Sequence, residues 1–359
     1  MAGLPWLRGK PRQSATPRPS ATPRLPVAAR LRPGRAAAEM PWERNSAEMD
    51  TVTNMDMGLD PEAGARCVEA QINYLLPGPA INRRFVSAGV EVNTGNYGPF
   101  AVTVRDGRAI RRHFTLERQG FQLLDHASAV RDFYDKDEVD RIYGAEVADC
   151  VKHLTGATFV ATMGWMIRNS GDLAKFRRAA GPYVHQGGVQ PPAGEAHIDT
   201  HPDYADRHAR ALYDRVRPNG PGYGRYIYSS FWRTFSEPPQ DCPLALCDHR
   251  SVGDHEGVPN FLHVVDRIPE GDARFAPMDD EGRPAAAIFR YNPAHRWWYF
   301  SYMTRAEALL IKFHDSNRAV AWRTPHTSFW DTSFPDRKVR ASIEYRSVAY
   351  FEPDTARSR

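Results

Sequence analysis

The segment Arg340-Ala-Ser-Ile-Glu-Tyr-Arg-Ser-Val-Ala-Tyr-Phe351 has the clearest strand pattern in the chain. In a β-strand, successive side chains point to opposite faces of the sheet. The polar side chains of the first half therefore share one face and the apolar ones the other: Arg340, Ser342, Glu344 and Arg346 against Ala341, Ile343 and Tyr345. The polar face is either exposed to solvent or lines a polar cavity, and the segment predicts a strand that borders such a cavity.

Other short runs of β-branched and aromatic residues, separated by turn residues, predict further strands. They span residues 68–74, 158–163, 226–232, 261–265, 287–291, 297–300 and 319–322, together with 86–104, in which residues 95–98 (Gly-Asn-Tyr-Gly) resemble a hairpin turn. Many short strands with turns between them indicate a barrel or sandwich. We therefore expect a mainly β fold with flanking helices.

Three segments have helical spacing. Residues 132–154 place apolar side chains at steps of three and four, which gives one stripe: Phe133, Val139, Ile142, Tyr143, Val147 and Val151. Residues 204–215 and 305–313 are the other two candidates. In the second of these, Thr304 followed by Glu307 resembles a capping box at a helix N-terminus.

The basic residues in excess are confined to the start of the chain. The 359-residue chain has a formal net charge of +4, yet no acidic residue precedes Glu39, where Arg, Pro, Ser, Ala and Thr dominate. We expect residues 1–60 to be a disordered Arg/Pro-rich tail and residues 61–359 to form a single domain. A transit peptide and a start codon assigned too far upstream both explain such a start.

The rest of the composition argues against several classes of protein. Beyond the tail the charge is close to neutral, so we expect neither a nucleic-acid nor a membrane partner. No run of about 18 apolar residues offers a membrane span, and no Gly-rich loop suggests nucleotide binding. The four cysteines are too scattered for a disulfide framework, which favours reduced thiols and a cytoplasmic location.

The segment Gly194-Glu-Ala-His-Ile-Asp-Thr200 contains the first candidate metal ligands. On a strand, His197 and Asp199 share a face with their Cα atoms about 6.5–7 Å apart, which suits two ligands of one ion. Two His and one carboxylate are typical of non-haem Fe(II) oxygenases. His201 and Asp203 repeat the spacing, but Pro202 lacks the N–H of a paired strand residue. Alone, the motif fits ordinary loop residues equally well.

His326 is the candidate for the third ligand, although a lone His of this kind also fits a core or surface position. Arg340 and Ser342 follow it on the polar face of the last strand. In a cavity, this pair could bind a carboxylate through a charge-assisted fork and one hydroxyl. A co-substrate such as 2-oxoglutarate needs that contact, because its other end chelates the metal. Arg346 is the alternative for this ion pair.

From about residue 119 to residue 351 the chain resembles the bacterial and fungal hydroxylase/desaturase family that includes the cephamycin 7-hydroxylase component and gibberellin desaturase. The matching segments occur in order: Gly120-Phe121, Asp132-Phe-Tyr-Asp135, Leu154-Thr-Gly-Ala157, Ala196-His-Ile-Asp199, Phe231-Trp-Arg233, Pro243-Leu-Ala-Leu-Cys-Asp248, Tyr291-Asn-Pro293, His295-Arg-Trp-Trp-Tyr-Phe300, Thr324-Pro-His-Thr327 and Arg340-x-Ser-Ile-Glu-x-Arg346. An ordered match over this length is more specific than any single motif.

The resemblance implies a double-stranded β-helix (jelly-roll) core and an Fe(II)- and 2-oxoglutarate-dependent dioxygenase. Such an enzyme would use O₂ to hydroxylate or desaturate a small molecule of the secondary-metabolite type, and a biosynthetic partner protein is a further expectation. The implied residues are His197, Asp199 and His326 for the metal, and Arg340 with Ser342, or Arg346, for 2-oxoglutarate. The choice between hydroxylation and desaturation stays open.

The substrate is the least defined part of the interpretation. Thr200 stands where the family has glutamine, Thr234 stands where proline is usual, and His201 is unexpected. All three lie beside the metal strand or a neighbouring motif and leave the substrate open. The candidates for the substrate pocket are basic or aromatic, although aromatic residues at strand spacing often belong to a core: Arg225, Tyr226, Tyr228, Trp232, Arg233, Trp297 and Trp298.

Two other functions compete with the oxygenase. A metal-dependent hydrolase could use a second group of ligand-type residues, although Gly253 and Gly257 indicate a loop there: Asp248, His249, Asp254, His255 and His263. A β-helix module that has lost catalysis and only binds a ligand is the other alternative.

Overall fold

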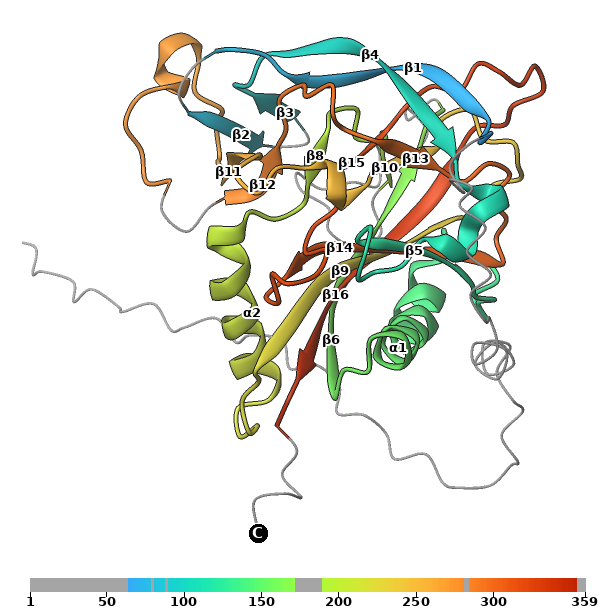
Figure 1. Cartoon of the computed structure of the whole chain (residues 1–359). Coiled ribbons are helices and arrows are strands. Elements are labelled where there is room, and N and C mark those ends of the chain that lie inside the picture. Colours follow the sequence, from blue (N-terminus) through green and yellow to red (C-terminus); the bar gives the residue numbers. More distant parts are fainter. Residues whose placement is uncertain (1–63, 79–80, 88–89, 172–188, 281–283, 354–359) are drawn as a thin grey trace, which may run out of the picture. The chain divides into compact units, whose positions relative to one another are not determined.

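The structure, a computed structural model, describes residues 64–78, 81–87, 90–171, 189–280 and 284–353. The tail predicted at residues 1–60 lies outside the described residues. Within the described part, strands form a ten-stranded and a six-stranded sheet, drawn as two layers in Figure 1. Most neighbouring strands are antiparallel; the parallel pairs are β4 with β13, β2 with β11, and β6 with β7.

The ten-stranded sheet contains many of the shorter strands. Its order across the sheet is β1 (Cys67–Leu75), β4 (Tyr97–Asp106), β13 (Trp297–Tyr299), β10 (Leu244–Cys247), β15 (His326–Ser328), β8 (His197–Ile198), β12 (Pro284–Ile288), β11 (Val258–Val264), β2 (Asn82–Ser87) and β3 (Val90–Asn93). The short strands β8 and β15 are central in this order.

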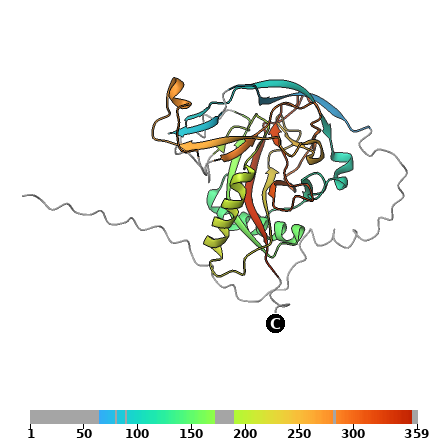
Figure 2. The ribbon, with the colours of Figure 1, turned by 60° about the vertical axis from the view of Figure 1, so that its left-hand side comes forward.

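The six-stranded sheet contains most of the long strands. Its order is β5 (Phe121–Asp125), β14 (Glu307–Asp315), β9 (Arg225–Thr234), β16 (Ala341–Phe351), β6 (Phe159–Asn169) and β7 (Val189–Gln190). The helix α1 (Lys136–Thr155) packs on β6 and β16, and α2 (Pro202–Val216) runs alongside β6 and β9 (Figures 1 and 2). The arrangement agrees with the predicted mainly β fold with flanking helices.

Alternation along the long strands divides the core into two parts. Phe231 of β9 and Ile343 and Tyr345 of β16 pack beneath α1. Tyr228 and Trp232, on the opposite face of β9, belong to the larger core between the two sheets. The face that the sequence predicted to be polar on β16 therefore points toward the ten-stranded sheet.

The helix α1 follows the predicted apolar stripe. It begins after Asp135, whose carboxylate accepts hydrogen bonds from the backbone N–H groups of Asp137 and Glu138. It ends at Gly156, which adopts the left-handed conformation with φ of 70°. The second predicted helix is also present, as α2, and His201 is its N-cap.

The helix predicted at residues 305–313 is wrong, because Glu307–Asp315 form the strand β14. Glu307 does accept hydrogen bonds from Thr304, as a capping box would require, but it does so at the start of a strand. Every residue of β14 is buried, and the strand lies between β5 and β9. Burial on both faces overrode the local helix signal.

Two strand predictions also fail. The strands on either side of residues 95–98 do not pair with each other, because β3 pairs with β2 and β4 pairs with β1. Residues 319–322 form no strand, although Ala321 and Trp322 are buried. In the first case the residue types were suitable, but each strand pairs with a partner other than its neighbour in the sequence.

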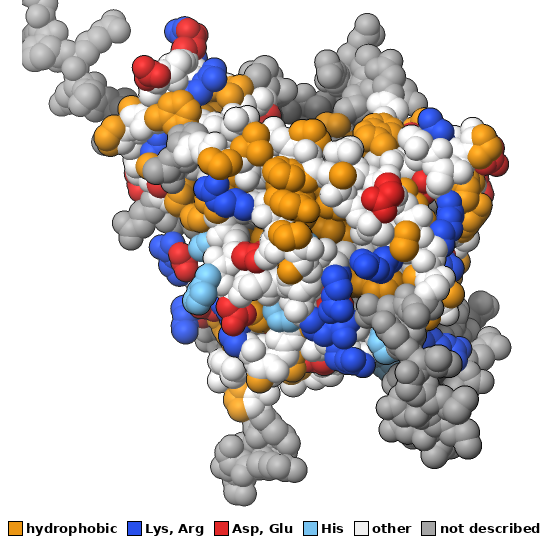
Figure 3. All heavy atoms as spheres, turned by 45° about the horizontal axis from the view of Figure 1, so that its top comes forward, with side chains coloured by type: hydrophobic (Ala, Val, Ile, Leu, Met, Phe, Trp, Pro, Cys, Tyr) orange, Lys and Arg blue, Asp and Glu red, His pale blue; other side chains and the backbone are white. Residues whose placement is uncertain are grey.

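The described surface and the cysteines agree with the composition. Cys67, Cys150, Cys242 and Cys247 are all free thiols. No helix in the described ranges is long and apolar enough to cross a membrane. On the face drawn in Figure 3, Lys and Arg side chains lie among Asp and Glu side chains, with hydrophobic side chains between them.

Candidate active site

The structure brings His197, Asp199 and His326 together on the ten-stranded sheet. β15 pairs with β8 so that His326 lies directly opposite His197, and the two ring centroids are 4.5 Å apart. Nε2 of His197 is 3.8 Å from Asp199 Oδ1, and Nε2 of His326 is 3.4 Å from Asp199 Oδ2. Of the described residues, only this group offers three ligand atoms, all within 4.8 Å of one another.

Backbone carbonyls determine which nitrogen of each histidine is free. Nδ1 of His197 is 2.8 Å from the carbonyl oxygen of Glu195, and Nδ1 of His326 is 3.2 Å from that of Thr324. A carbonyl only accepts, so each Nδ1 carries the proton and donates it. Each Nε2 therefore presents a lone pair toward Asp199, the arrangement that a metal ligand needs.

The charges of the cluster also suit a metal cation. Burial and the neighbouring His326 lower the pKa of His197, which favours the neutral ring. Burial opposes ionisation of Asp199, but Arg346 and the two histidines hold the pKa of its carboxyl well below the ordinary value. These shifts favour a neutral ring at His197 and a carboxylate at Asp199, and Asp199 Oδ2 has no hydrogen-bond partner within the described residues.

A narrow cavity of about 20 Å³ extends from the two histidines to Arg340. Arg340 is 2% exposed, and its Nε and Nη1 have no hydrogen-bond acceptor in the described part of the chain. The hydroxyls of Ser230 and Ser342 are also buried without a partner there. Buried donors are normally satisfied, so this group indicates a site for an oxygen-rich anion.

Arg346 lies on the other side of the cluster. Its Nη2 is 3.0 Å from Asp199 Oδ1 and 2.8 Å from Glu344 Oε1. The two candidate arginines for 2-oxoglutarate are therefore in different places: Arg340 lines the narrow cavity, whereas Arg346 contacts a metal ligand directly.

A second, wider cavity of about 380 Å³ is lined by Asp199 and Arg346. Its lining comes from β6, β9, β11, β16 and α2, and includes Trp165, Tyr204, His208, Tyr228 and Leu262. Burial and the nearby Arg215 and Arg346 lower the pKa of His208, which favours a neutral ring. Glu344 lines both cavities.

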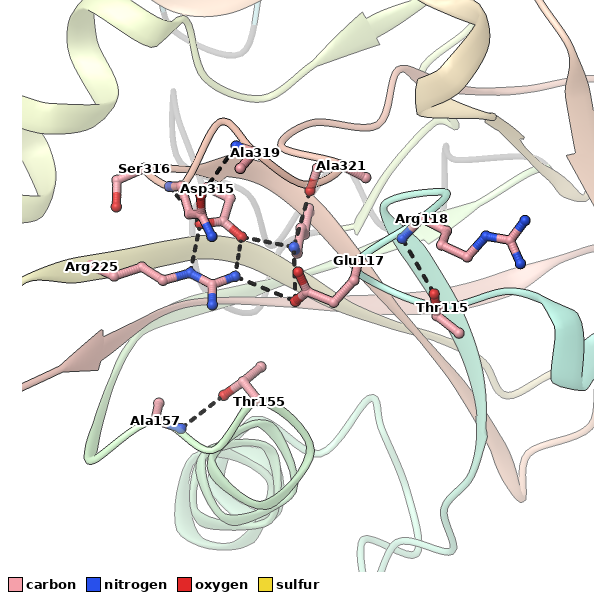
Figure 4. Close-up of polar contacts among 12 residues, drawn as sticks. Thr115, Glu117, Arg118, Thr155, Ala157, Arg225, Asp315, Ser316, Ala319 and Ala321 are labelled. Atoms are coloured by element: carbon pink, nitrogen blue, oxygen red, sulfur yellow. Dashed lines mark hydrogen bonds and ion pairs between the residues drawn. The ribbon is translucent and has the colours of Figure 1, made fainter. Parts of the chain in front are cut away.

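Some of the residues predicted for the substrate pocket lie elsewhere. Trp232 lines the narrow cavity, where its ring is 5.7 Å from the guanidinium carbon of Arg340. Arg225 pairs with Asp315 and Glu117 (Figure 4). Arg233 is fully buried beside α1, where it donates to Tyr143 and to the carbonyl oxygen of His126.

The aromatic candidates divide in the same way. Tyr228 lines the wider cavity. Tyr226 instead donates its hydroxyl to Asp206. Trp297 donates to the Tyr74 hydroxyl at 2.7 Å, and Trp298 packs edge-on against Phe114 in the core. These contacts account for Tyr226, Trp297 and Trp298 without a substrate.

The alternative cluster of ligand-type residues does not assemble. Asp248 pairs with Arg250 and Arg296, while His263 lies 2.7 Å from Asp280. Nδ1 of His249 contacts the carbonyl oxygen of Arg323. His201 begins α2 and does not join the metal cluster, as the proline between it and Asp203 predicted. Among the residues that the structure describes, these side chains therefore form no second metal centre of the kind that the hydrolase alternative requires.

Several residues of the site were missed by sequence reasoning. Ser230 shares a face of β9 with Tyr228 and Trp232, so strict alternation would have identified it. The residues from α2, Tyr204 and His208, carried no such signal. Their position depends on how the helix packs, which the local sequence does not specify.

Two facing β-sheets that hold a cluster of two histidines and one aspartate, with a buried arginine in the adjoining cavity, define the class of jelly-roll oxygenases with a non-haem metal site. The chain belongs to the family described as "Oxidoreductase/YMDC permease-like domain", whose model matches residues 72–350.

Its relatives are fungal enzymes. The hydroxylase/desaturase efuI of Hormonema carpetanum is 31% identical over 262 residues, which cover 71% of this chain and 85% of that protein. The hydroxylase/desaturase CTB9 of Cercospora beticola is 31% identical over 72% of this chain and 79% of its own length. The predicted hydroxylase/desaturase resemblance, and with it the class of 2-oxoglutarate-dependent dioxygenases, is confirmed.

A solved structure shares the fold. The iron and alpha-ketoglutarate-dependent endoperoxidase NvfI superimposes with a TM-score of 0.64 at 23% identity, covering 80% of this chain and 99% of that chain. At this identity the likeness concerns the fold, and it confirms the predicted jelly-roll core.

Proposed function

We propose that the chain is an Fe(II)- and 2-oxoglutarate-dependent hydroxylase or desaturase that acts on a small molecule of the secondary-metabolite type. The observation that carries the proposal is the meeting of His197, Asp199 and His326, from two segments far apart in the sequence, next to one cavity lined by the two histidines and another lined by Asp199. When bound, Fe(II) with 2-oxoglutarate and O₂ supplies the oxidising power that breaks a C–H bond, and 2-oxoglutarate becomes succinate and CO₂.

The ligand set fits Fe(II). Two imidazole nitrogens and one carboxylate oxygen lie within 4.8 Å of one another, and the Asp199 oxygen that has no partner among the described residues would be available to coordinate. The backbone carbonyls that accept from each Nδ1 hold both rings in the ligand orientation. These residues would hold the metal, and they leave the remaining coordination positions to 2-oxoglutarate and O₂.

Arg340 would bind the far carboxylate of 2-oxoglutarate. The guanidinium carries two buried donors without acceptors, and Ser230 and Ser342 add two hydroxyls. The cavity is narrow, so a five-carbon dicarboxylate requires its lining side chains to shift. Arg346 is the weaker candidate, because it already pairs with Asp199 and Glu344.

The substrate would occupy the wider cavity. Its volume of about 380 Å³ lies in the range of small-molecule sites, and its walls combine aromatic and apolar side chains with several charged ones. Asp199 at its inner end brings the substrate close to the metal, while α2 covers one side. A cytoplasmic location and a biosynthetic partner protein remain parts of the proposal that rest on sequence alone.

The metal assignment is tested by replacing two ligands in turn. His197→Ala and Asp199→Ala should each abolish stoichiometric Fe(II) binding, measured by metal analysis after anaerobic reconstitution, and should stop 2-oxoglutarate-dependent succinate release. Circular dichroism should remain that of the wild type, since both side chains can be shortened without disturbing a strand pair.

His201→Ala is the matched control, because this neighbouring histidine lies outside the cluster. It should retain iron and turnover. Full iron occupancy or turnover in either ligand variant would exclude the assignment.

A further inference from the structure

The two oxygens of Asp199 are in different environments. Oδ1 is 3.0 Å from Nη2 of Arg346. Oδ2 has no hydrogen-bond partner within the described residues and lies 3.4 Å from Nε2 of His326. The carboxylate is thus held through one oxygen, and the other remains available as a single ligand atom.

Arg346 is itself fixed by two contacts. Glu344, two residues earlier on the same face of β16, accepts a hydrogen bond of 2.8 Å from it. The guanidinium carbon lies 5.8 Å from the ring centroid of Phe313, a residue of β14. A guanidinium with an anionic partner and an aromatic neighbour has little freedom to rotate away from Asp199.

The same aromatic ring connects Arg346 to a second ligand. Phe313 stacks on His326 with ring centroids 5.3 Å apart and planes inclined by only 6°. Arg346 therefore contacts Asp199 directly, and Phe313 lies between Arg346 and His326. Arg346 thus neighbours two of the three ligands, one through an ion pair and the other through an intervening ring.

A cation beside a metal site also has an opposing effect, because it repels the metal ion. Here Glu344 offsets the charge of Arg346 at 2.8 Å, so the local charge of this pair is close to zero. The main effect of Arg346 on metal binding is therefore to orient the carboxylate of Asp199. Partners of metal ligands typically contribute a factor of about 10–100 to metal affinity.

We propose that Arg346 is a positioning residue of the metal centre: it holds Asp199 for coordination through Oδ2, and Glu344 and Phe313 hold it in turn. This role rests on the proposed function, since it presupposes that the cluster binds a metal. It also assigns the two arginines of β16 different tasks, Arg340 at the co-substrate and Arg346 at the ligand.

The test measures metal affinity without turnover. Mn²⁺ is titrated by isothermal calorimetry and by electron paramagnetic resonance into the full-length wild type and the Arg346→Met, Arg346→Lys and Arg340→Met variants. We expect Arg346→Met to bind Mn²⁺ about 10–100-fold more weakly. Arg346→Lys, which keeps one donor to Oδ1, should recover part of the loss.

Arg340→Met is the matched control. It removes a second buried arginine, which directly precedes β16 at the same alternation as Arg346, yet it should leave Mn²⁺ affinity within about twofold of the wild type. Circular dichroism establishes that each variant is folded. If Arg346→Met does not fold, the comparison of Mn²⁺ affinity is made with Arg346→Lys.

The outcomes separate the two proposals. If folded Arg346 variants bind Mn²⁺ as tightly as the wild type, or if Arg340→Met loses affinity to the same extent, the positioning role is wrong. If the wild type itself binds no Mn²⁺, the metal centre is wrong, and the role of Arg346 falls with it.

Discussion

At the scale of single residues, the site contains buried polar groups whose hydrogen-bonding capacity is not satisfied by the described residues. Arg340 is buried with donors that no described residue satisfies, and Asp199 presents an oxygen without a partner. Leaving such groups unpaired costs free energy in folding, which a bound metal and a bound dicarboxylate would recover. Arg225 and Arg233, by contrast, find their acceptors within the fold.

This difference predicts the effect of removing Arg340. In Arg340→Ala, 2-oxoglutarate should bind the metal-loaded enzyme about 2–5 kcal/mol more weakly, because a buried carboxylate loses its charged partner. Calorimetric titration of 2-oxoglutarate measures the change. Arg225→Ala, which removes an arginine that pairs with Asp315 away from the cluster, is the control and should bind normally. Normal binding in Arg340→Ala together with loss in Arg346→Ala would reverse the assignment.

How far the sequence predicted these roles depends on alternation. Period two along residues 340–346 correctly placed Arg340, Glu344 and Arg346 at the cavities, and Ser342, at the same alternation, is buried between Arg340 and Glu344 in the sequence. The same rule applied to β9 separates Trp232 from Arg233, but both were proposed for the substrate because of their chemistry. The sequence did not indicate which face of β9 is covered by α1, and that decides which one reaches the site.

At the scale of elements, the strongest local signals were not always decisive. Thr304 and Glu307 make the contacts of a capping box, yet the residues that follow extend between two other strands. The stripe on α1 was interpreted correctly because one side of that helix remains exposed. Amphipathic elements can be recognised from their own sequence, whereas an element buried on all sides depends on its neighbours.

Gly120, just before β5, lies where the backbone passes close to Arg323 and Thr324, so a substitution there measures how tightly these segments pack. Its φ is +88°, and a Cβ there would overlap the Thr324 hydroxyl and lie 3.2 Å from the Arg323 carbonyl oxygen. Gly120→Ala should lower the free energy of unfolding by about 2–4 kcal/mol, from backbone strain and overlap together. Urea denaturation measures the loss.

Gly222→Ala separates the two contributions. Gly222 has a φ of +81° but no atom within 4 Å of an added Cβ, so only strain should appear, about 1 kcal/mol. Equal losses in the two variants would show that overlap with Thr324 is not significant.

At the scale of the whole molecule, two buried histidines link stability to pH. Burial and Arg233 lower the pKa of His126 to about 4, and burial and Arg318 lower the pKa of His314 to about 4. Both are neutral in the folded chain, and their ordinary pKa is 6.5. Below pH 6.5 the unfolded chain takes up protons that the folded chain does not.

We therefore expect the free energy of unfolding to be fully retained above pH 6.5 and to fall as the pH is lowered toward 4. Each histidine accounts for up to about 3 kcal/mol of that loss. In His126→Asn, whose side-chain oxygen can still accept from Arg233, the loss between pH 7 and pH 4.5 should be smaller. Urea denaturation at several pH values measures it, and an unchanged slope would contradict the assignment.

The residue shared by the two cavities limits which positions can be varied to change the substrate specificity of this enzyme. Glu344 belongs to both cavities and also anchors Arg346, so a change there would disturb co-substrate, metal and substrate at once. Tyr204 and His208 on α2 and Leu262 on β11 border the wider cavity alone. Libraries that vary these three positions would sample new substrates and leave the metal ligands and the 2-oxoglutarate site unchanged. These positions are therefore the first ones to vary in directed evolution.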